Sequence, residues 1–144
     1  MPSEADYRLP RTVIPRHYEL ALTPDLAGAT FGGHVVIDVH VAEAVSEIVL
    51  NTAELTMHAA VLSNDLGQRL EATAESDEDA ERTTLTVASN LEPGPWKLEI
   101  SFDGILNDDL RGFYRSVYTD PDGNKKTIAT TQFEATEARR AFPC

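Results

Sequence analysis

The sequence contains one cysteine, Cys144, and therefore cannot form a disulfide within the chain. It has no apolar run of roughly 18 residues or more, the length that a transmembrane helix needs. Its first residues, Met1–Asp6, lack the basic and apolar regions of a secretory signal peptide. Together these absences predict a protein of a reducing compartment, the cytoplasm.

Basic residues are scarce: 12 Lys and Arg stand against 24 Asp and Glu, which gives a formal net charge of -12. Nucleic-acid-binding surfaces need clustered Lys and Arg, and anionic membranes attract basic rather than acidic proteins. We therefore expect neither a nucleic acid nor a membrane as a partner. A chain of 144 residues can bury a sizeable core, and we expect a single domain over residues 1–144.

The usual signatures of catalytic and metal sites are missing. The sequence has no His-Glu-x-x-His pair, no Gly-x-Ser-x-Gly elbow, no cysteine cluster and no Gly-rich phosphate loop. His34, Asp38 and His40 would share one strand face, which allows a surface metal site, although a solvated polar face is the simpler interpretation. The acidic cluster 76–81 lacks the glycine of a calcium loop and is predicted to be a solvated hairpin tip. From the residues alone, the chain has no complete active site.

Most of the chain shows the two-residue periodicity of β-strands. Apolar and polar side chains alternate most clearly in segments 31–41 and 96–102. Many short strands separated by turns are typical of an all-β fold, and we predict an antiparallel β sandwich. Turn-forming residues cluster at 64–67, 92–95 and 121–124, and further strands are expected at 18–22, 47–50, 55–63, 69–74, 83–87, 112–119 and 125–131.

Two features depart from this strand pattern. Gly32 and Gly33 lie inside a predicted strand, where glycine more often marks a bulge or close packing. Segment 134–141 is rich in Ala, Glu and Arg, and we expect a helix there that Pro143 ends soon after.

Residues 131–144 read TQFEATEARRAFPC. Together with other segments in the same order and spacing, this motif closely resembles the zinc aminopeptidases of the aminopeptidase N and puromycin-sensitive aminopeptidase family. In that family the motif continues into Trp/Phe-Asp-Glu-Pro, so we expect this chain to be truncated after its Phe-Pro-Cys. The other matching segments are Tyr7–Pro10, Val13–Leu20, Pro24–Leu26, Phe31–Gly33 and Gly112–Ser116.

The resemblance implies both a fold and a role. The first domain of these enzymes is an antiparallel β sandwich, often called saddle-like, which agrees with the strand pattern. The next domain, thermolysin-like, binds zinc through His-Glu-x-x-His and a further Glu, and recognises the substrate's amino terminus through Gly-x-Met-Glu-Asn. Neither motif occurs here. The resemblance therefore implies the N-terminal domain of an enzyme that releases N-terminal amino acids from peptides. Alone, it would bind no zinc, carry no catalytic residue and be inactive.

The resemblance also assigns two substrate-binding residues. Glu134 would bind the free α-amine of the peptide, and Gln132 would contact its first residue and backbone. A carboxylate holding an ammonium group is a charge-assisted hydrogen bond that strengthens in a desolvated pocket. Taken without its neighbours, Glu134 is better read as an acid in the first turn of a helix. Nearby, structural roles are expected for Arg139, Arg140, Phe133, Phe142 and Cys144.

A second hypothesis from another class is a free-standing β-sandwich module that binds a peptide or a protein without catalysis. The two hypotheses differ in the surface around Phe133 and Phe142. An exposed apolar patch there would mark the interface with the missing thermolysin-like domain. A polar, closed surface would favour the module.

Overall fold

The structure is a computed structural model, and it describes residues 7–144. Nine β-strands and one short 3₁₀-helix follow one another along these residues, which confirms the all-β prediction. The elements are β1 (Val13–Asp25), β2 (Thr30–Val41), β3 (Val45–Asn51), β4 (Leu55–Ser63), β5 (Arg69–Asp77), β6 (Arg82–Leu91), β7 (Gly94–Ile105), β8 (Gly112–Thr119), β9 (Lys125–Gln132) and η1 (Glu137–Arg140).

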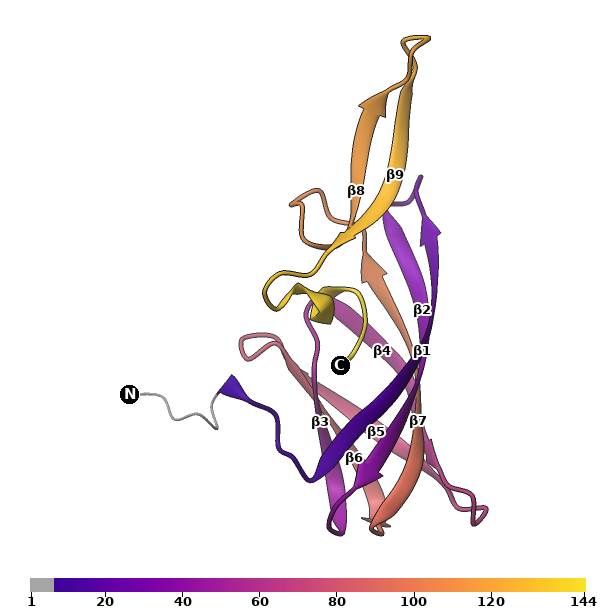
Figure 1. The fold of residues 1–144 in the computed structure, drawn as a ribbon, viewed down its shortest axis with the longest axis vertical. Coiled ribbons are helices and arrows are strands. Elements are labelled where there is room, and N and C mark those ends of the chain that lie inside the picture. Colours follow the sequence, from indigo (N-terminus) through magenta and orange to yellow (C-terminus); the bar gives the residue numbers. More distant parts are fainter. Residues whose placement is uncertain (1–6) are drawn as a thin grey trace.

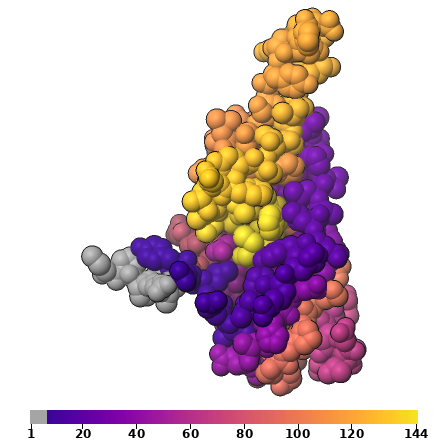
Figure 2. Space-filling model, viewed as in Figure 1, coloured from indigo at the N-terminus to yellow at the C-terminus, as the bar shows by residue number. Residues whose placement is uncertain are grey.

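Seven strands form one antiparallel sheet, in the order β1-β2-β7-β4-β5-β6-β3. The sheet curls strongly, so that β3 at one edge comes round towards β1 at the other (Figure 1). β8 and β9 form a separate two-stranded sheet, a hairpin that projects from one end of the curled sheet (Figure 1; Figure 2). The predicted antiparallel architecture thus takes the form of one curled sheet with a second, smaller sheet.

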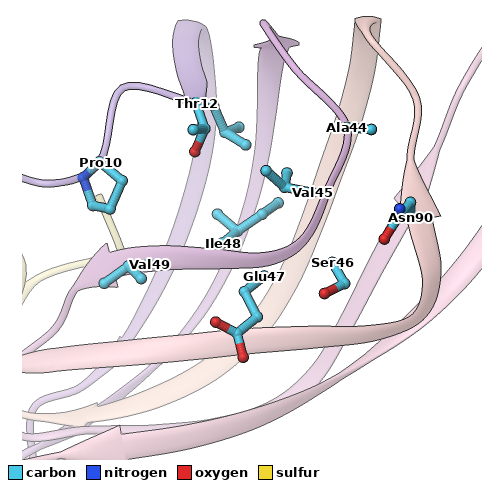
Figure 3. A pocket seen from close by; sticks show the side chains of 10 residues that line it. Pro10, Thr12, Ala44, Val45, Ser46, Glu47, Ile48, Val49 and Asn90 are labelled. Atoms are coloured by element: carbon cyan, nitrogen blue, oxygen red, sulfur yellow. The ribbon is translucent and has the colours of Figure 1, made fainter.

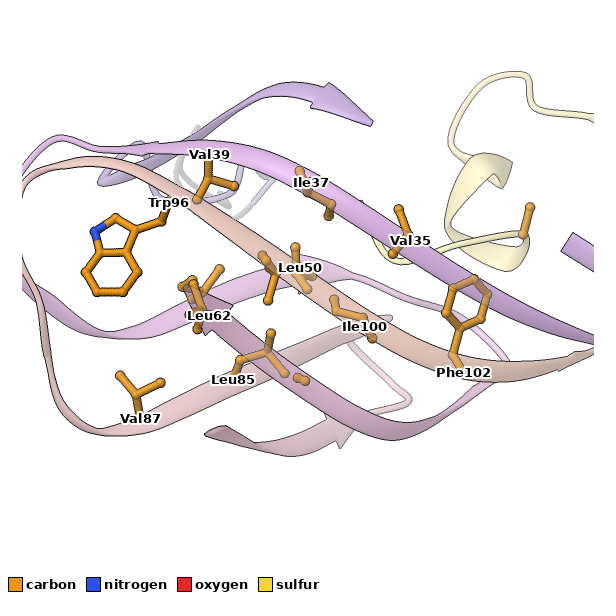
Figure 4. Close-up of a cluster of buried hydrophobic side chains, with 14 of the residues drawn as sticks. Val35, Ile37, Val39, Leu50, Leu62, Leu85, Val87, Trp96, Ile100 and Phe102 are labelled. Atoms are coloured by element: carbon orange, nitrogen blue, oxygen red, sulfur yellow. The ribbon is translucent and has the colours of Figure 1, made fainter. Parts of the chain in front are cut away.

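The hydrophobic core lies inside the curl. β2 and β7 pair along nearly their whole lengths, and each directs one row of apolar side chains inwards (Figure 4). Full burial of one such side chain stabilises the fold by roughly 1.5–3 kcal/mol relative to an exposed position. The inner rows consist of Phe31, Val35, Ile37, Val39 and Val41 in β2, and of Trp96, Leu98, Ile100 and Phe102 in β7.

Two aromatic rings cover two glycines at the end of this core. Gly33 lies opposite Phe102, and Gly104 lies opposite Phe31, in the β2–β7 pairing. A Cβ atom added to either glycine would come within 2.2 Å of the facing ring, so only a hydrogen atom fits at these positions. The expectation of close packing is therefore confirmed at Gly33. Gly32 faces the other side of the sheet and has only Asp103 nearby, at 3.6 Å.

The C-terminal segment 133–144 corrects one expectation. We expected a helix over 134–141, but only Glu137–Arg140 is helical, as a 3₁₀-helix. The segment is held instead by tertiary backbone hydrogen bonds: the Arg139 carbonyl, within the 3₁₀-helix, accepts the N–H of Ala53 in the β3–β4 loop at 3.0 Å, and Cys144 pairs with Asn51 at the end of β3. A single helical turn has little stability of its own, so these tertiary hydrogen bonds decide the conformation.

The predicted hairpin tips are found between the strands. The Asp120 carboxylate accepts the N–H groups of Asp122 and Asn124, at 3.0 and 2.8 Å, and so closes the turn between β8 and β9. In the acidic cluster 76–81, the Ala80 N–H donates to the Asp77 carboxylate and closes the turn between β5 and β6. None of the helical segments within residues 7–144 has the length and apolar character that crossing a bilayer would require.

Candidate functional site

Gln132 and Glu134 lie at the junction between the end of β9 and the C-terminal segment 133–144. Gln132 is the last residue of β9 and pairs with Gly112 of β8. Both Gln132 and Glu134 are exposed. The Glu134 N–H donates to Gln132 Oε1 at 2.8 Å, which fixes the glutamine side chain against the backbone. The next peptide bond, between Glu134 and Ala135, is cis.

This geometry leaves two polar groups open to a ligand. Within the described residues 7–144, no cation lies within ion-pair distance of the Glu134 carboxylate. The Gln132 amide nitrogen is likewise without a hydrogen-bond partner among those residues. A carboxylate beside an amide NH₂ group can bind an ammonium group with the first and a carbonyl oxygen with the second.

A cluster of ion pairs around the buried Arg140 side chain fixes the segment behind these two residues. The Arg140 side chain is only 9% exposed, and its guanidinium contacts Glu54 at 2.9 Å, Glu81 at 3.1 Å and Glu137 at 2.5 Å. Arg139 adds a second contact to Glu81, at 3.2 Å. Burial alone would lower the pKa of Arg140, but the hydrogen bond to Glu137 and the charge of Glu54 raise that pKa overall. The guanidinium therefore stays charged at any physiological pH.

Gly112 lies between this ion-pair cluster and Gln132 and contacts both. Gly112 has a φ of 69°, and a Cβ atom there would lie 2.6 Å from the Cβ of Arg140. Because Gly112 pairs with Gln132, the packing of Arg140 on Gly112 locates the end of β9. The structural role expected of Arg139 and Arg140, as partners either of acidic neighbours or of the missing domain, takes the first form in these contacts.

Aromatic side chains also hold the C-terminal segment in place, closer to the end of the chain. The Phe142 ring makes edge contacts with Tyr18 of β1 and with Phe133, at centroid distances of 5.8 and 6.2 Å. Phe142 is half-buried, whereas Phe133 is 38% exposed. Burial raises the pKa of the Cys144 thiol, although Arg139 acts in the opposite direction. A protonated, half-buried thiol fits the structural role expected of Cys144.

On the outer face of the sheet, His34 and His58 each lie against a different carboxylate. His34 Nε2 lies 2.9 Å from Glu99 Oε1, and His58 Nε2 lies 2.6 Å from Asp103 Oδ2. Asp38, which would join a metal site with His34, instead accepts a hydrogen bond from Lys97 at 2.6 Å. Across residues 7–144, no group of three or more His, Cys, Asp or Glu side chains is arranged to hold a metal ion.

Two members of the anchoring cluster were not predicted from the sequence. Glu81 was assigned to a solvated hairpin tip, but its carboxylate binds both Arg139 and Arg140. No sequence motif indicates a role for Glu54, which contacts Arg140 from the loop between β3 and β4. Glu54 and Glu81 both have positive φ values, 56° and 51°, which a pattern of side-chain types does not reveal.

The exposed Glu134 and Gln132 thus lie at the end of a hairpin beside a curled antiparallel sheet. Residues 14–144 match the Peptidase M1 N-terminal domain, so the chain belongs to that family. The resemblance seen in the sequence is thereby confirmed.

Individual relatives are aminopeptidases. The chain is 40% identical over 141 residues to aminopeptidase M1 of Arabidopsis thaliana, and 38% identical over 138 residues to puromycin-sensitive aminopeptidase of Caenorhabditis elegans. It is also 40% identical to the alanine/arginine aminopeptidase of Saccharomyces cerevisiae. These alignments cover 94–95% of this chain but only 15–16% of each relative.

Proposed function

We propose that this chain is the N-terminal domain of a zinc-dependent aminopeptidase, a cytoplasmic hydrolase that releases N-terminal amino acids from peptides. Membership of the Peptidase M1 N-terminal domain family and the similarity to three aminopeptidases support the proposal. Because the chain spans about 15% of those relatives, the proposal places the thermolysin-like catalytic domain in the rest of the parent chain.

Within the parent enzyme, the role proposed for this domain is to form the wall that binds the substrate's free amino terminus. The observation that supports this role is the exposed Glu134 carboxylate, which is unpaired among residues 7–144 and belongs to a residue whose backbone N–H binds the Gln132 side chain. An ammonium group bound there would fix the register of the peptide, and orientation of the scissile bond is itself a large source of catalysis. A peptide without a free amine would lose this contact.

In this proposal, another part of the parent enzyme binds the zinc ion. The donor set of residues 7–144 does not fit a zinc site, because no three metal-ligating side chains converge there. The proposal assigns the metal ligands and the catalytic residues to the rest of the parent enzyme. Alone, this chain is expected to keep the substrate-binding wall and to have no peptidase activity.

The substitution Glu134→Gln in the parent enzyme tests the proposed role. The amide keeps the size of the carboxylate but loses its charge, so one charge-assisted hydrogen bond to the ammonium group is weakened. Such bonds are worth about 1.5–3 kcal/mol, which corresponds to a fall in kcat/KM of roughly 10–150-fold with a higher KM. Steady-state kinetics on an aminoacyl reporter measure the change, and metal analysis should show unaltered zinc content.

Glu71→Gln is a matched control, because Glu71 is also an exposed glutamate but lies on β5, away from the β9 end. It should leave KM and kcat unchanged. Unaltered kinetics in Glu134→Gln would remove Glu134 from the substrate site. Equal losses in both variants would also count against the proposal, because they would reflect a general charge effect.

A further inference from the structure

Cys144 pairs with the free edge of β3 in a specific way. The Asn51 N–H donates to the Cys144 carbonyl at 2.6 Å, and the Cys144 N–H donates to the Asn51 carbonyl at 3.1 Å. Two residues that exchange both hydrogen bonds form a hydrogen-bonded pair of an antiparallel ladder. Cys144 is therefore already in strand register with β3.

Among residues 7–144, no strand pairs with the rest of that edge of β3, and Pro10 and Thr12 line a cavity beside it. In a strand, alternate residues direct their N–H and C=O groups to the same side, so Val49 points its backbone the way Asn51 does. Leu50 points to the other side, where it pairs with Thr83 of β6. Within residues 7–144, β6 is the only strand that pairs with β3, so the backbone groups of Val49 have no ladder partner.

An apolar cavity runs beside this open edge. It has a volume of about 250 Å³ and lies between β3 and the outer edge of β1, with Val13, Ile48 and Cys144 among its lining residues. A second cavity, of about 410 Å³, follows it along β3 and is lined by residues 45–49 (Figure 3). The C-terminus of the chain lies between the two edge strands (Figure 1).

We propose that the free edge of β3 receives an added strand, formed by the residues that follow Cys144 in the parent protein. Antiparallel register from the Asn51–Cys144 pair places the second residue after Cys144 opposite Val49, and directs the chain along both cavities. This inference rests on the part of the proposed function that makes the chain one portion of a longer enzyme. Main-chain hydrogen bonds supply the affinity of such an added strand, and the cavities receive its side chains.

The register also identifies the amide that reports this pairing. Val49 is the first residue of β3 beyond the Asn51–Cys144 pair whose backbone groups face the free edge, so the Val49 amide is the informative probe.

Amide hydrogen exchange, followed by NMR, tests the inference in two versions of the chain. One version ends at Cys144, and the other continues for about ten residues of the parent's own sequence, the length of a long strand. The Val49 amide should exchange at least about tenfold more slowly in the longer version, because it gains a hydrogen-bonded partner. The Leu50 amide, already bonded to β6, serves as the internal reference and should be slow in both versions.

Substitutions at Cys144 in the longer version separate backbone pairing from other effects. Cys144→Pro removes the N–H that donates to Asn51 and should abolish the added protection of Val49. Cys144→Ser keeps that N–H and should retain the protection. Slow exchange at the buried Ile100 in every version confirms that the core is folded.

Two results would overturn the inference. An equally fast Val49 amide in both versions would show that the following residues do not add to β3. A slow Val49 amide in the shorter version, appearing only at high protein concentration, would assign the edge to a second copy of the chain. Neither readout depends on substrate binding, so a failure of the Glu134 proposal would leave this test unchanged.

Discussion

Arg140 shows how a single residue can fix the position of a candidate binding site. Its guanidinium lies among three carboxylates that come from the β3–β4 loop, the β5–β6 turn and η1. Charge pairs of this kind stabilise a fold chiefly because removing one partner leaves the others uncompensated. Arg139 differs, because among residues 7–144 it forms an ion pair with Glu81 and with no second carboxylate.

Arg140→Ala is expected to destabilise the chain by about 2–3 kcal/mol, because its charged hydrogen bonds are lost in a largely buried site. Arg139→Ala is the matched control, with an expected loss of about 1 kcal/mol or less for one partly exposed ion pair. Urea unfolding of the two variants measures both values. Equal effects, or a larger effect at Arg139, would show that the cluster around Arg140 does not anchor the segment.

At this scale the sequence indicates Glu134 and Gln132 but not the residues that hold them. The motif around these two residues is continuous in the chain, so the resemblance alone was enough to single them out. Glu81 lies 59 positions before Arg140, and nothing in either neighbourhood indicates that they meet. Such a contact exists only after the β5–β6 turn and the C-terminal segment have been placed by the fold.

The pairing of β2 with β7 depends on two positions where only glycine fits. Gly33→Ala would place a Cβ atom 2.2 Å from the Phe102 ring, and this ring is buried and cannot swing into solvent. We expect a loss of about 1–3 kcal/mol, the usual cost of overpacking a core. Differential scanning calorimetry should record a lower Tm.

Gly32→Ala makes a sharp comparison, because Gly32 is the adjacent residue on the opposite face. Its added methyl group meets only Asp103, at 3.6 Å, an ordinary van der Waals distance. The expected change in stability is within about 0.5 kcal/mol. A similar loss of stability in both variants would mean that the two glycines are needed for their backbone conformation rather than for the contact between Gly33 and the Phe102 ring.

Among the elements, strand periodicity was informative and helix composition was not. The strands at 55–63 and 112–119 have the bounds that the sequence predicts. Alternation reports which face is buried, and that face is set by the strand itself. The α-helix expected at 134–141 does not form because the segment is held by tertiary contacts that no local pattern encodes: the Arg139 carbonyl accepts the Ala53 N–H, and Cys144 exchanges backbone hydrogen bonds with Asn51.

The order of strands in the whole sheet could not be read from the sequence. β7 lies between β2 and β4, although β4 follows β3 along the chain. Every strand of this antiparallel sheet shows the same alternation, so the pattern does not say which strands are neighbours. The family resemblance agreed with the antiparallel β sandwich that the strand pattern predicts, but it did not give the strand order either.

The last prediction concerns the whole molecule. If zinc and catalysis belong to the rest of the parent, a chelator should abolish aminopeptidase activity in the full-length enzyme and leave the Tm of this chain unchanged. The reason is that no metal-ligating group of three side chains exists among residues 7–144 to be emptied. Thermal unfolding with and without chelator, together with an aminoacyl reporter assay, measures both effects. Zinc-dependent turnover by the purified chain, or a chelator-induced fall in its Tm, would contradict the assignment of this chain as a substrate-binding domain without a metal.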